Sequence, residues 1–570
     1  MEKYTGHDWM RMIDLGIRFK EEVGGANAWD RYKSYYVGNY NVDGKGIIPV
    51  NMIFANGKVM VPKCYFRNPK VKVTPLQPKN HYSSFVVDSL INQLIRELRV
   101  KYQMKAMIED CYATGTSFGK LGFDSEYGFV PDKQDTQTDK KGNQIEYNVN
   151  IKNGQPWFKW ADAESVVVPW GAAKSGDPEI TDIPWIANRV VRHIDDVKSD
   201  PKYKNTKELK GEYKPDIDIN RVKHNEDVNY IELWEIRDIK RKRIYVVTRE
   251  KEGFLMDEED SLQIEGFPYV QLQFNTHPKY FWGISDIRQL EPHQMALNVA
   301  YTIFVNHIRL SLKKIIYQKD QLVNIDELLS DKFAAAIACT GDVNSVVKEL
   351  NISIPPDIIN AINQIRMTIR ELVGYSRNEA GEFDSSSRRT ATEANLVKAG
   401  SETRSSERRD IVADVLERTC QKLLQIVLTH WDKSQVVPII GEDGVKYWVE
   451  YSADDIRGEY QFLINAEEAQ PVDSNSIKED AMGLLKLLQE DPDFAPEERK
   501  KLKMALFSQF THLGIDPEKA LMPREGMGGS PEQPVPMQQW AGGMEKAKRN
   551  PKAGGQQQMQ QMMQALQGGK

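Results

Sequence analysis

The stretch ATGTSFGKLGF, residues 113–123, contains the residue types that bind phosphate in nucleoside triphosphatases. In a phosphate-binding loop, backbone amides and a lysine surround the phosphates, and a Ser or Thr after the lysine holds magnesium. The spacing differs here, because three residues instead of four separate Gly115 from Gly119. Leu121 follows Lys120, so the hydroxyl that would hold magnesium is missing. The stretch therefore does not predict a nucleotide site.

The order of elements around this stretch also differs, because a phosphate-binding loop leads from a strand into the N-terminus of a helix. The pattern here predicts a helix that ends near Thr114 and a strand that follows it. We interpret Gly115 as a helix C-cap, and Gly119 and Gly122 as positions of close packing or of a bulge. Lys120 is then expected to point into solvent.

Other enzyme motifs do not stand out either. The sequence contains no GxSxG, HExxH or GxGxxG, and its nine histidines are not paired at metal-ligand spacing. The acidic run DEED at 257–260 resembles a metal-binding patch, but it is typical of a solvated turn. We expect no enzyme and no cofactor, with a packaging ATPase or a nuclease as the alternative. Four cysteines without paired spacing predict no zinc site and a reducing compartment: Cys64, Cys111, Cys339 and Cys420.

The composition describes a soluble, folded protein. At 570 residues the chain is too long for one core, and roughly three or four units are expected. Acidic residues exceed basic ones by 82 to 76, a net charge of −6, which argues against tight nucleic-acid binding through bulk charge. No apolar run approaches the ~20 residues of a membrane helix. The amphipathic, acid-containing N-terminus does not resemble a signal peptide, so we expect an intracellular protein or part of an assembly built there.

Periodicity predicts the elements that position these residues, and the fold class is α+β. Residues 7–36 have helical spacing, and Val50–Phe54 and Val59–Val61 are β-like. Val71, Val73 and Pro75 alternate as in an edge strand. A single long helix is expected over 83–114.

Residues 117–275 have a period near two and many turn residues, which predicts a β-rich domain. A polar insertion at 131–148 is expected to form a hairpin tip, and a Lys/Asp-rich stretch interrupts the domain at 196–226. Residues 285–317 are then predicted to be helical.

A small segment at 318–356, with a short helix from Ile325 and a strand in SVVKEL, ends at two prolines. A second helix follows over 357–374, with Asp357 as N-cap and Gly374 as C-cap. The two long helices are expected to run antiparallel and to project the small segment away from the body.

The rest of the chain begins with the Ser/Arg-rich stretch SSSRRTATEANLVKAGSETRSSERR at 385–409, which leads into a helix predicted over 391–431. Thr390 or Thr392 suits the N-cap, and Thr390 with Glu393 has capping-box spacing. The alternating charges of this helix fit either a solvated face or the lining of a cavity. Strands are expected within 436–464, helices near 475–490 and 496–513, and disorder or folding on assembly in the Gly-, Gln- and Met-rich tail.

Five segments, in this order, resemble the portal proteins of tailed double-stranded DNA bacteriophages, which are head–tail connectors, here of a podovirus-like kind. The most specific is the Thr-Ala-Thr-Glu start of the long helix, and the resemblance covers roughly residues 5–515. The segments are VPKCYFRNPKVKV (61–73), ATGTSFGKLGF (113–123), WADAESVVVPWGA (160–172), WIANRVVRH (185–193) and RTATEANLVKAGSETR (389–404).

The resemblance implies a portal fold with a mixed α/β wing, an antiparallel helical stem, a small α/β clip, a long kinked helix with a tunnel loop, and a helical crown. The implied boundaries are 1–280 and 432–470 for the wing, 281–317 and 357–374 for the stem, 318–356 for the clip, 375–390 for the tunnel loop, 391–431 for the long helix, 471–521 for the crown and 522–570 for a flexible tail.

The resemblance also implies a function and partners. The chain would form a dodecameric ring at one capsid vertex, through which double-stranded DNA passes non-specifically during packaging and ejection. Terminase large subunit would dock on the clip during packaging, and head-completion or tail adaptor proteins afterwards. Major capsid and scaffolding proteins would be further partners. The ring would belong to the virion and assemble in the host cytoplasm, and no membrane is involved. Another head-completion protein is the structural alternative.

Candidate site residues follow from this resemblance. A mildly acidic channel with few basic residues lets DNA move, because each phosphate neutralised by Lys or Arg adds affinity. The basic stem residues could equally point outward or pair between subunits. The tunnel-loop candidates are Arg377, Asn378, Glu379, Ser385, Ser386, Ser387, Arg388 and Arg389; the stem lumen candidates are Arg309, Lys313 and Lys314; the clip candidates are Asp326, Glu327, Asp331, Lys332 and Lys348.

Overall fold

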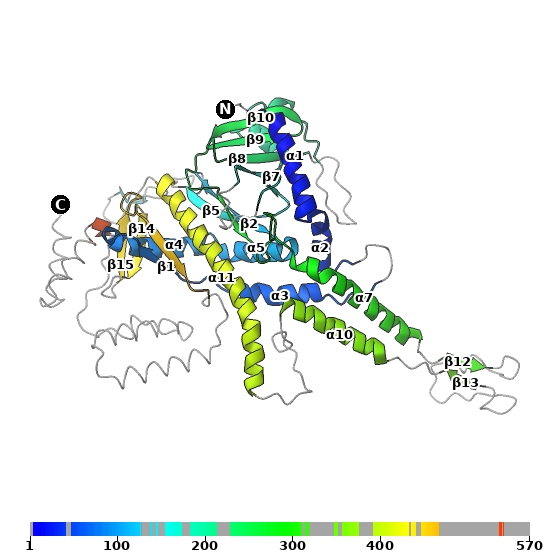
Figure 1. The fold of residues 1–570 in the computed structure, drawn as a ribbon. Coiled ribbons are helices and arrows are strands. Elements are labelled where there is room, and N and C mark those ends of the chain that lie inside the picture. The colour runs from blue at the N-terminus through cyan, green and yellow to red at the C-terminus, as the bar shows by residue number, and fades with distance from the viewer. Residues whose placement is uncertain are drawn as a thin grey trace, which may run out of the picture. The chain divides into compact units, whose positions relative to one another are not determined.

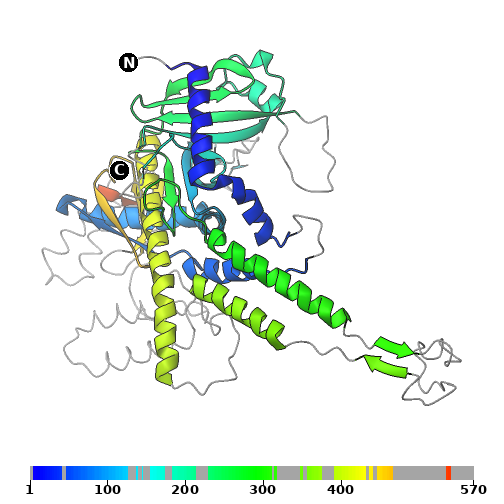
Figure 2. The ribbon, with the colours of Figure 1, turned by 45° about the vertical axis from the view of Figure 1, so that its right-hand side comes forward.

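The computed structural model contains helices and sheets in two compact units (Figures 1 and 2). Unit 1 comprises Met1–Ala26, Met60–Ile284 and Ser405–Lys570, and unit 2 comprises Asn27–Val59 and Ser285–Arg404. The structure describes residues 4–40, 47–125, 127, 137–138, 144–145, 154–173, 183–213, 229–310, 314–317, 347–350, 356–374, 391–431, 435–440, 446–466, 535–538 and 540.

Unit 1 contains a five-stranded antiparallel sheet with the strand order β10-β9-β8-β7-β6. Helix α1, Gly6–Val23, lies along one face of this sheet (Figure 1). Its residues Trp9 and Ile13 are buried against Trp185, Trp234 and other apolar side chains of the strands. The strands are β6 (Val166–Val167), β7 (Trp185–His193), β8 (Tyr230–Asp238), β9 (Arg243–Thr248) and β10 (Lys251–Glu259).

The side chain of Lys20, on α1, ends in a buried backbone turn. Its Nζ donates to the carbonyl oxygens of Ala163, Glu164 and Val166 at 3.3, 2.6 and 3.0 Å. The ammonium also lies 5.7 Å from the ring centre of Trp282. Burial lowers the pKa of Lys20 to about 7, because the charged form is costly to remove from water.

A second, three-stranded antiparallel sheet has the order β11-β2-β5, formed by Tyr269–Leu272, Ser117–Asp124 and Gln155–Ala161. It contains Gly119 and Gly122 of the opening stretch, and Gly115 lies just before it; the predicted structural roles of these glycines are confirmed. Gly115 has φ +87° and its amide donates to the carbonyl of Cys111, as a helix C-cap does. A Cβ on Gly119 or Gly122 would meet the rings of Phe158 or Trp157, so both glycines permit close packing.

The predicted single helix over 83–114 is two helices, α4 (His81–Glu97) and α5 (Val100–Thr114). Arg99 adopts φ +52° between them, which interrupts the helix. The predicted helix over 7–36 is likewise divided. It consists of α1 and of α2 (Trp29–Tyr36), separated by Gly25 with φ +71°.

The prediction of β-structure at residues 50–61 is wrong, because Met52–Cys64 forms helix α3. Met52, Asn56, Met60 and Cys64 are buried at intervals of four residues, the spacing of one helix face. The β-branched residues of this segment fit a short strand as well as a helix. The burial of residues along one helix face distinguishes the two. The predicted edge strand is confirmed as β1, Val71–Pro75, which pairs with β16, Tyr460–Ile464.

Three further strands belong to the C-terminal part of unit 1. β14 (Gln435–Ile440) pairs antiparallel with β15 (Lys446–Tyr451), and β15 pairs parallel with β17 (Val535–Pro536). β17 and the buried Trp540 lie in the tail. The expectation of a disordered tail is therefore wrong for these residues. The predicted strands of 436–464 are confirmed as β14, β15 and β16, and the predicted long helix as α11, Ala391–His430.

Minor elements complete the described chain. The polar insertion contains a hairpin of β3 (Gln137–Thr138) and β4 (Gln144–Ile145), as predicted. The Lys/Asp-rich stretch begins within α6, Ile194–Ser199. Single 3-10 turns are η1 (Ala26–Ala28), η2 (Pro78–Asn80) and η3 (Thr206–Glu208).

Unit 2 is built on the helices α2, α7 (Asp286–Leu310) and α10 (Pro356–Val373). The prediction of a helix to residue 317 is wrong, because Lys314–Tyr317 forms the strand β12. Helix α10 begins at Pro356, so Asp357 lies in its first turn and is not the N-cap. Proline suits the first helical position, where no amide hydrogen bond is lost. Gly374 ends the helix with φ +81°, as predicted.

Candidate functional site

The part of unit 2 that resembles a stem and clip is a helical arm, by which we mean α7, β12, β13 (Val347–Leu350) and α10. The two helices lie side by side and run antiparallel in both views (Figures 1 and 2). Beyond them, β12 and β13 pair antiparallel, with Lys314 opposite Leu350 and Tyr317 opposite Val347. The predicted antiparallel helices and the predicted strand in SVVKEL are thereby confirmed.

A polar ladder fixes an extended segment of the chain along α7. The amides of Ile48, Val50 and Met52 donate to the side chains of Thr302, Asn298 and Gln294 at 3.0, 3.0 and 3.1 Å. Gln294 Nε2 in turn donates to the carbonyl of Val50 and to Asn298 Oδ1, both at 2.8 Å. Gln294 and Asn298 are fully buried, so these hydrogen bonds form away from solvent.

The repeat lengths of the two segments explain why this ladder fits. Four residues of an α-helix advance about 6.0 Å, and two residues of an extended chain advance about 6.6 Å. Side chains at positions 294, 298 and 302 therefore meet every second amide of the extended segment, in antiparallel order. The ladder therefore joins side chains of α7 to the main chain of residues 48–52.

The arm has several apolar side chains that are exposed in the part of the chain that the structure describes. From Val299 to Ile308, no side chain of α7 is fully buried. In α10, only Ile369, Arg370 and Val373 are buried, although the helix is amphipathic. Six apolar side chains of the arm are 38–53 % exposed: Val299, Ile303, Ile308, Ile359, Met367 and Leu372.

Exposed apolar surface of this kind identifies an interaction site. Scattered exposed apolar residues are ordinary on a monomer, but a concentration of them on one element indicates a protein contact. Two helices also bury little apolar surface by themselves, so a projecting pair is stabilised when other helices pack on it. The arm is therefore the candidate assembly surface of this chain.

The structure locates few of the predicted site residues. Arg309 lies in the last turn of α7, and Lys348 lies in β13 opposite Ile316. Lys314 begins β12, so its predicted place on the first long helix is wrong. Lys313, the tunnel-loop candidates Arg377, Asn378, Glu379, Ser385, Ser386, Ser387, Arg388 and Arg389, and the clip candidates Asp326, Glu327, Asp331 and Lys332 lie outside the described residues.

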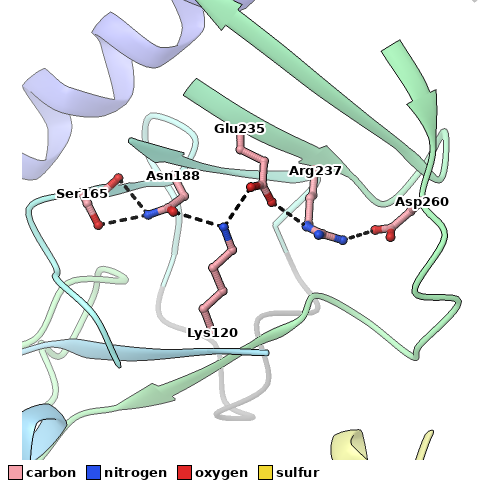
Figure 3. Close-up of polar contacts among 6 residues, drawn as sticks. All are labelled: Lys120, Ser165, Asn188, Glu235, Arg237 and Asp260. Carbon is pink, nitrogen blue, oxygen red and sulfur yellow. Dashed lines mark hydrogen bonds and ion pairs between the residues drawn. The ribbon is translucent and has the colours of Figure 1, made fainter. Parts of the chain in front are cut away.

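The lysine that suggested nucleotide chemistry belongs to a row of charged side chains between the three-stranded and the five-stranded sheets of unit 1 (Figure 3). Lys120 Nζ lies 3.0 Å from Glu235 Oε2 and donates to Asn188 Oδ1 at 3.2 Å. Arg237 Nε donates to Glu235 Oε1 at 3.2 Å, and its NH1 donates to Asp260 at 2.6 Å. Asn188 Nδ2 donates to the Ser165 hydroxyl at 3.0 Å. The expectation that Lys120 points into solvent is wrong, because its side chain is only 12 % exposed.

The positive and negative charges of these side chains balance one another between the two sheets. Burial alone would raise the pKa of Glu235, but Lys120 and Arg237 outweigh it through charge and hydrogen bonds and hold that pKa at about 2. Burial likewise opposes the charge of Lys120, yet Glu235 keeps the pKa of the lysine above its ordinary value. Glu235, Lys120 and Arg237 are therefore charged at neutral pH, and Lys120 is engaged within the protein.

The acidic run at 257–260 is also engaged within the fold. Asp257, Glu258 and Glu259 belong to strand β10, so the predicted turn is wrong, but Glu258 and Glu259 are exposed, as expected of a solvated segment. Asp257 Oδ1 accepts from Arg243 Nε at 2.7 Å, and Asp260 accepts from Arg237. The pairing of Asp257 with Arg243 on the adjacent strand β9 is the cross-strand charge pairing of a sheet.

Two kinds of site are not found among the described residues. No group of three or more His, Cys, Asp or Glu side chains there is placed to hold a metal ion. Within the same residues, no helix has the length and hydropathy needed to span a bilayer.

Sequence reasoning missed the polar ladder and the exposed arm residues. Gln294, Asn298 and Thr302 recur at four-residue spacing in the sequence, which was a usable signal for a polar helix stripe. Their partners, the amides of residues 48–52, carry no signal in the side-chain pattern. Exposure of Ile303 or Met367 depends on what the chain packs against, which no local pattern encodes.

Comparison with known proteins agrees with the resemblance seen in the sequence. No curated protein matches the chain. The model of one family, described as the phage SU10 portal protein, matches residues 187–568, about two-thirds of the sequence. The match includes β7–β11, the arm, α11 and the C-terminal strands. On this match, the chain belongs to the phage SU10 portal protein family.

Proposed function

We propose that this chain forms a dodecameric ring at one vertex of a phage capsid, and that double-stranded DNA passes through the ring during packaging and ejection. In this assignment α7 and α10 form the stem, residues around β12 and β13 form the clip, and the sheets of unit 1 form the wing. Residues 375–390 are the tunnel loop and 471–521 the crown. Terminase and then head-completion or tail adaptor proteins dock on the clip.

The exposed apolar residues of the arm carry this proposal. A stem helix in a ring has neighbours on both sides, so apolar side chains that a single chain leaves in water become buried between subunits. Val299 and Ile303 on α7 and Ile359 and Met367 on α10 are such side chains. The family supports the same function, since a portal is an opening in a capsid. The acidic net charge of −6 suits a conduit that must release DNA.

Charge introduced on the arm tests the assembly surface. The double substitution Ile303→Glu and Met367→Glu places a carboxylate in each helix where apolar contact between subunits is proposed. We expect the purified variant to remain folded by circular dichroism but to lose the ring in mass photometry. Ile303→Leu with Met367→Leu is the matched control, because it keeps an apolar side chain at the same two positions. Rings that survive the first pair of substitutions would contradict the proposed interface.

The DNA path is tested by the tunnel loop. Deletion of residues 378–388 removes its centre, and we expect rings to assemble while particles contain less genome than wild type. A packaging assay that quantifies nuclease-protected DNA measures this effect. Loss of ring assembly in the deletion variant would show that the segment is structural and not a gate.

A further inference from the structure

Residues near the end of the chain pack on the body of unit 1. Strand β17 pairs parallel with β15, with Val535 opposite Val449 and Pro536 opposite Glu450. Met537 and Trp540, which follow it, are both buried, and Trp540 is only 1 % exposed. We call Val535–Gln538 together with Trp540 the clasp. The clasp is thus a short strand followed by an aromatic anchor.

The surface that receives the clasp, which we call the seat, consists of β15, the first turns of α4, and Asp455. The ring of Trp540 meets Tyr82 and Phe85 edge-on, with ring centres 5.8 and 6.2 Å away. Tyr82 and Phe85 are three residues apart on α4 and so share one face of that helix. Gln538 Nε2 donates to Asp455 Oδ1 at 3.4 Å. Main-chain pairing together with an aromatic contact is the pattern by which proteins bind peptides through strand addition.

The seat requires an occupant. In the described part of the chain, the sheet order β14-β15-β17 leaves the clasp as the only cover on one edge of β15. Val449 and Tyr451 of this strand are buried. An uncovered strand edge presents unpaired amides and carbonyls and attracts other strands. The chemistry of the seat selects an extended apolar segment that carries a tryptophan, which is the chemistry of this chain's own tail.

The stretch that leads to the clasp is long enough for the clasp on a given seat to come from the same chain or from an adjacent one. Residues 467–534, a stretch of 68 residues, separate the described end of unit 1 at Ala466 from Val535. Such a stretch could reach about 220 Å if fully extended, and still about 100 Å at the rise of an α-helix. The entropic cost of closing a loop also grows only slowly with loop length. A seat on an adjacent copy is therefore within reach and offers the same contacts.

We propose that, in the assembled ring, the seat of each subunit binds the clasp of a neighbouring copy. This inference rests on the proposed function, because it needs subunits side by side. Exchange of an identical element costs little, since every contact of the closed monomer is kept. In a closed ring each subunit gives one clasp and receives one, so no seat stays open. The tether raises the local concentration of the clasp and so stabilises the assembly without a new interface.

Peptide binding tests the seat. The probe is a fluorescein-labelled peptide of residues 531–543, titrated into full-length chain that carries Trp540→Ala. We expect the peptide to bind this variant at least tenfold more tightly than wild type, whose seats are occupied. A peptide with alanine in place of its tryptophan should not bind. Equal binding to both chains, or none to a folded Trp540→Ala chain, would overturn the assignment of the seat.

Cross-linking of co-expressed chains tests the exchange itself. One chain carries Asp455→Cys and the other Gln538→Cys, and a short bismaleimide joins cysteines that lie close together. Exchange predicts a covalent dimer from the mixture and none from either variant alone, which also controls for the natural cysteines. A product of monomer mass from the double variant, with no dimer from the mixture, would show that the clasp binds its own chain.

Negative-stain images of the same samples separate the two proposals. Rings without the cross-linked dimer would contradict the exchange and leave the proposed function intact. Cross-linked dimers without rings would support the exchange and contradict the proposed ring. Absence of both would contradict both proposals.

Discussion

Lys120 and Glu235 form an ion pair of 3.0 Å that joins the three-stranded and the five-stranded sheets of unit 1. Lys120 extends from β2 of the three-stranded sheet, and Glu235 lies on β8 of the five-stranded sheet. Arg237 and Asp260 continue the row of charged side chains on the same side (Figure 3). A lysine in a glycine-rich stretch that resembles a nucleotide site therefore fixes how two sheets pack.

Loss of Lys120 should destabilise unit 1. Lys120→Met leaves the Glu235 carboxylate with one cation in a largely buried site. Breaking a buried pair costs about 3–5 kcal/mol. Partial exposure of both side chains lowers this expectation to roughly 2–4 kcal/mol. Thermal unfolding followed by circular dichroism should show a clearly lower midpoint. Lys204→Met, in the exposed Lys204–Glu258 pair, is the matched control and should leave the midpoint nearly unchanged.

Acid should weaken the same contact. Because the folded-state pKa of Glu235, about 2, lies below its ordinary value of 4.5, its stabilisation is complete above pH 4.5. It is lost as the pH falls from 4.5 towards 2, by on the order of a few kcal/mol. Glu235→Gln should therefore be less stable than wild type at pH 7 and lose less stability between pH 5 and 2.5. Parallel pH curves for wild type and Glu235→Gln would contradict this linkage.

Lys20 should give a dependence of the same sign at alkaline pH. Its folded-state pKa, about 7, lies below the ordinary 10.5, so the unfolded chain binds more protons between these values. The free energy of unfolding should rise with pH across that window in wild type. Lys20→Gln keeps a hydrogen-bond donor near the Ala163–Val166 turn and should remove this rise. Denaturant unfolding at pH 7, 8 and 9 measures it, with the exposed Lys202→Gln as control.

The polar ladder along α7 predicts a local effect in unit 2. Gln294→Leu deprives the Met52 amide and the Val50 carbonyl of their partners in a buried site. An unsatisfied buried polar group costs about 1–3 kcal/mol. Hydrogen exchange of the amides of residues 48–52 should accelerate at least tenfold in this variant. Gln289→Leu, at an exposed position of the same helix, should not change that exchange, and unchanged exchange in Gln294→Leu would contradict the role of the ladder.

Long periodic segments were predictable from the sequence because their burial repeats within the segment itself. Helix α11 and the strands β14–β16 fall where their periodicity indicates, and Gly115 caps α5 as its position suggests. Short apolar segments were not predictable in the same way. Residues 52–64 contain enough β-branched side chains for a strand, and only their burial at intervals of four identifies α3.

The site was less predictable than the fold, because its decisive contacts join residues distant in sequence. Lys120 is a surface lysine by every local criterion, and it is buried because Glu235, 115 residues away, faces it. The same holds for Trp540, which lies in a polar tail and finds Tyr82 and Phe85 on α4. Composition predicts only the average environment of a segment. A single aromatic side chain that packs on the body can make part of that segment ordered.

The most direct measurement of the central claim is the mass of the purified wild-type chain by mass photometry, together with negative-stain images. A ring of twelve subunits of 65.3 kDa has a mass of roughly 0.8 MDa. We expect a peak near this mass and annular particles with a central opening. A chain that stays monomeric over a wide concentration range, with no annular particles, would contradict the proposal that it forms a portal ring.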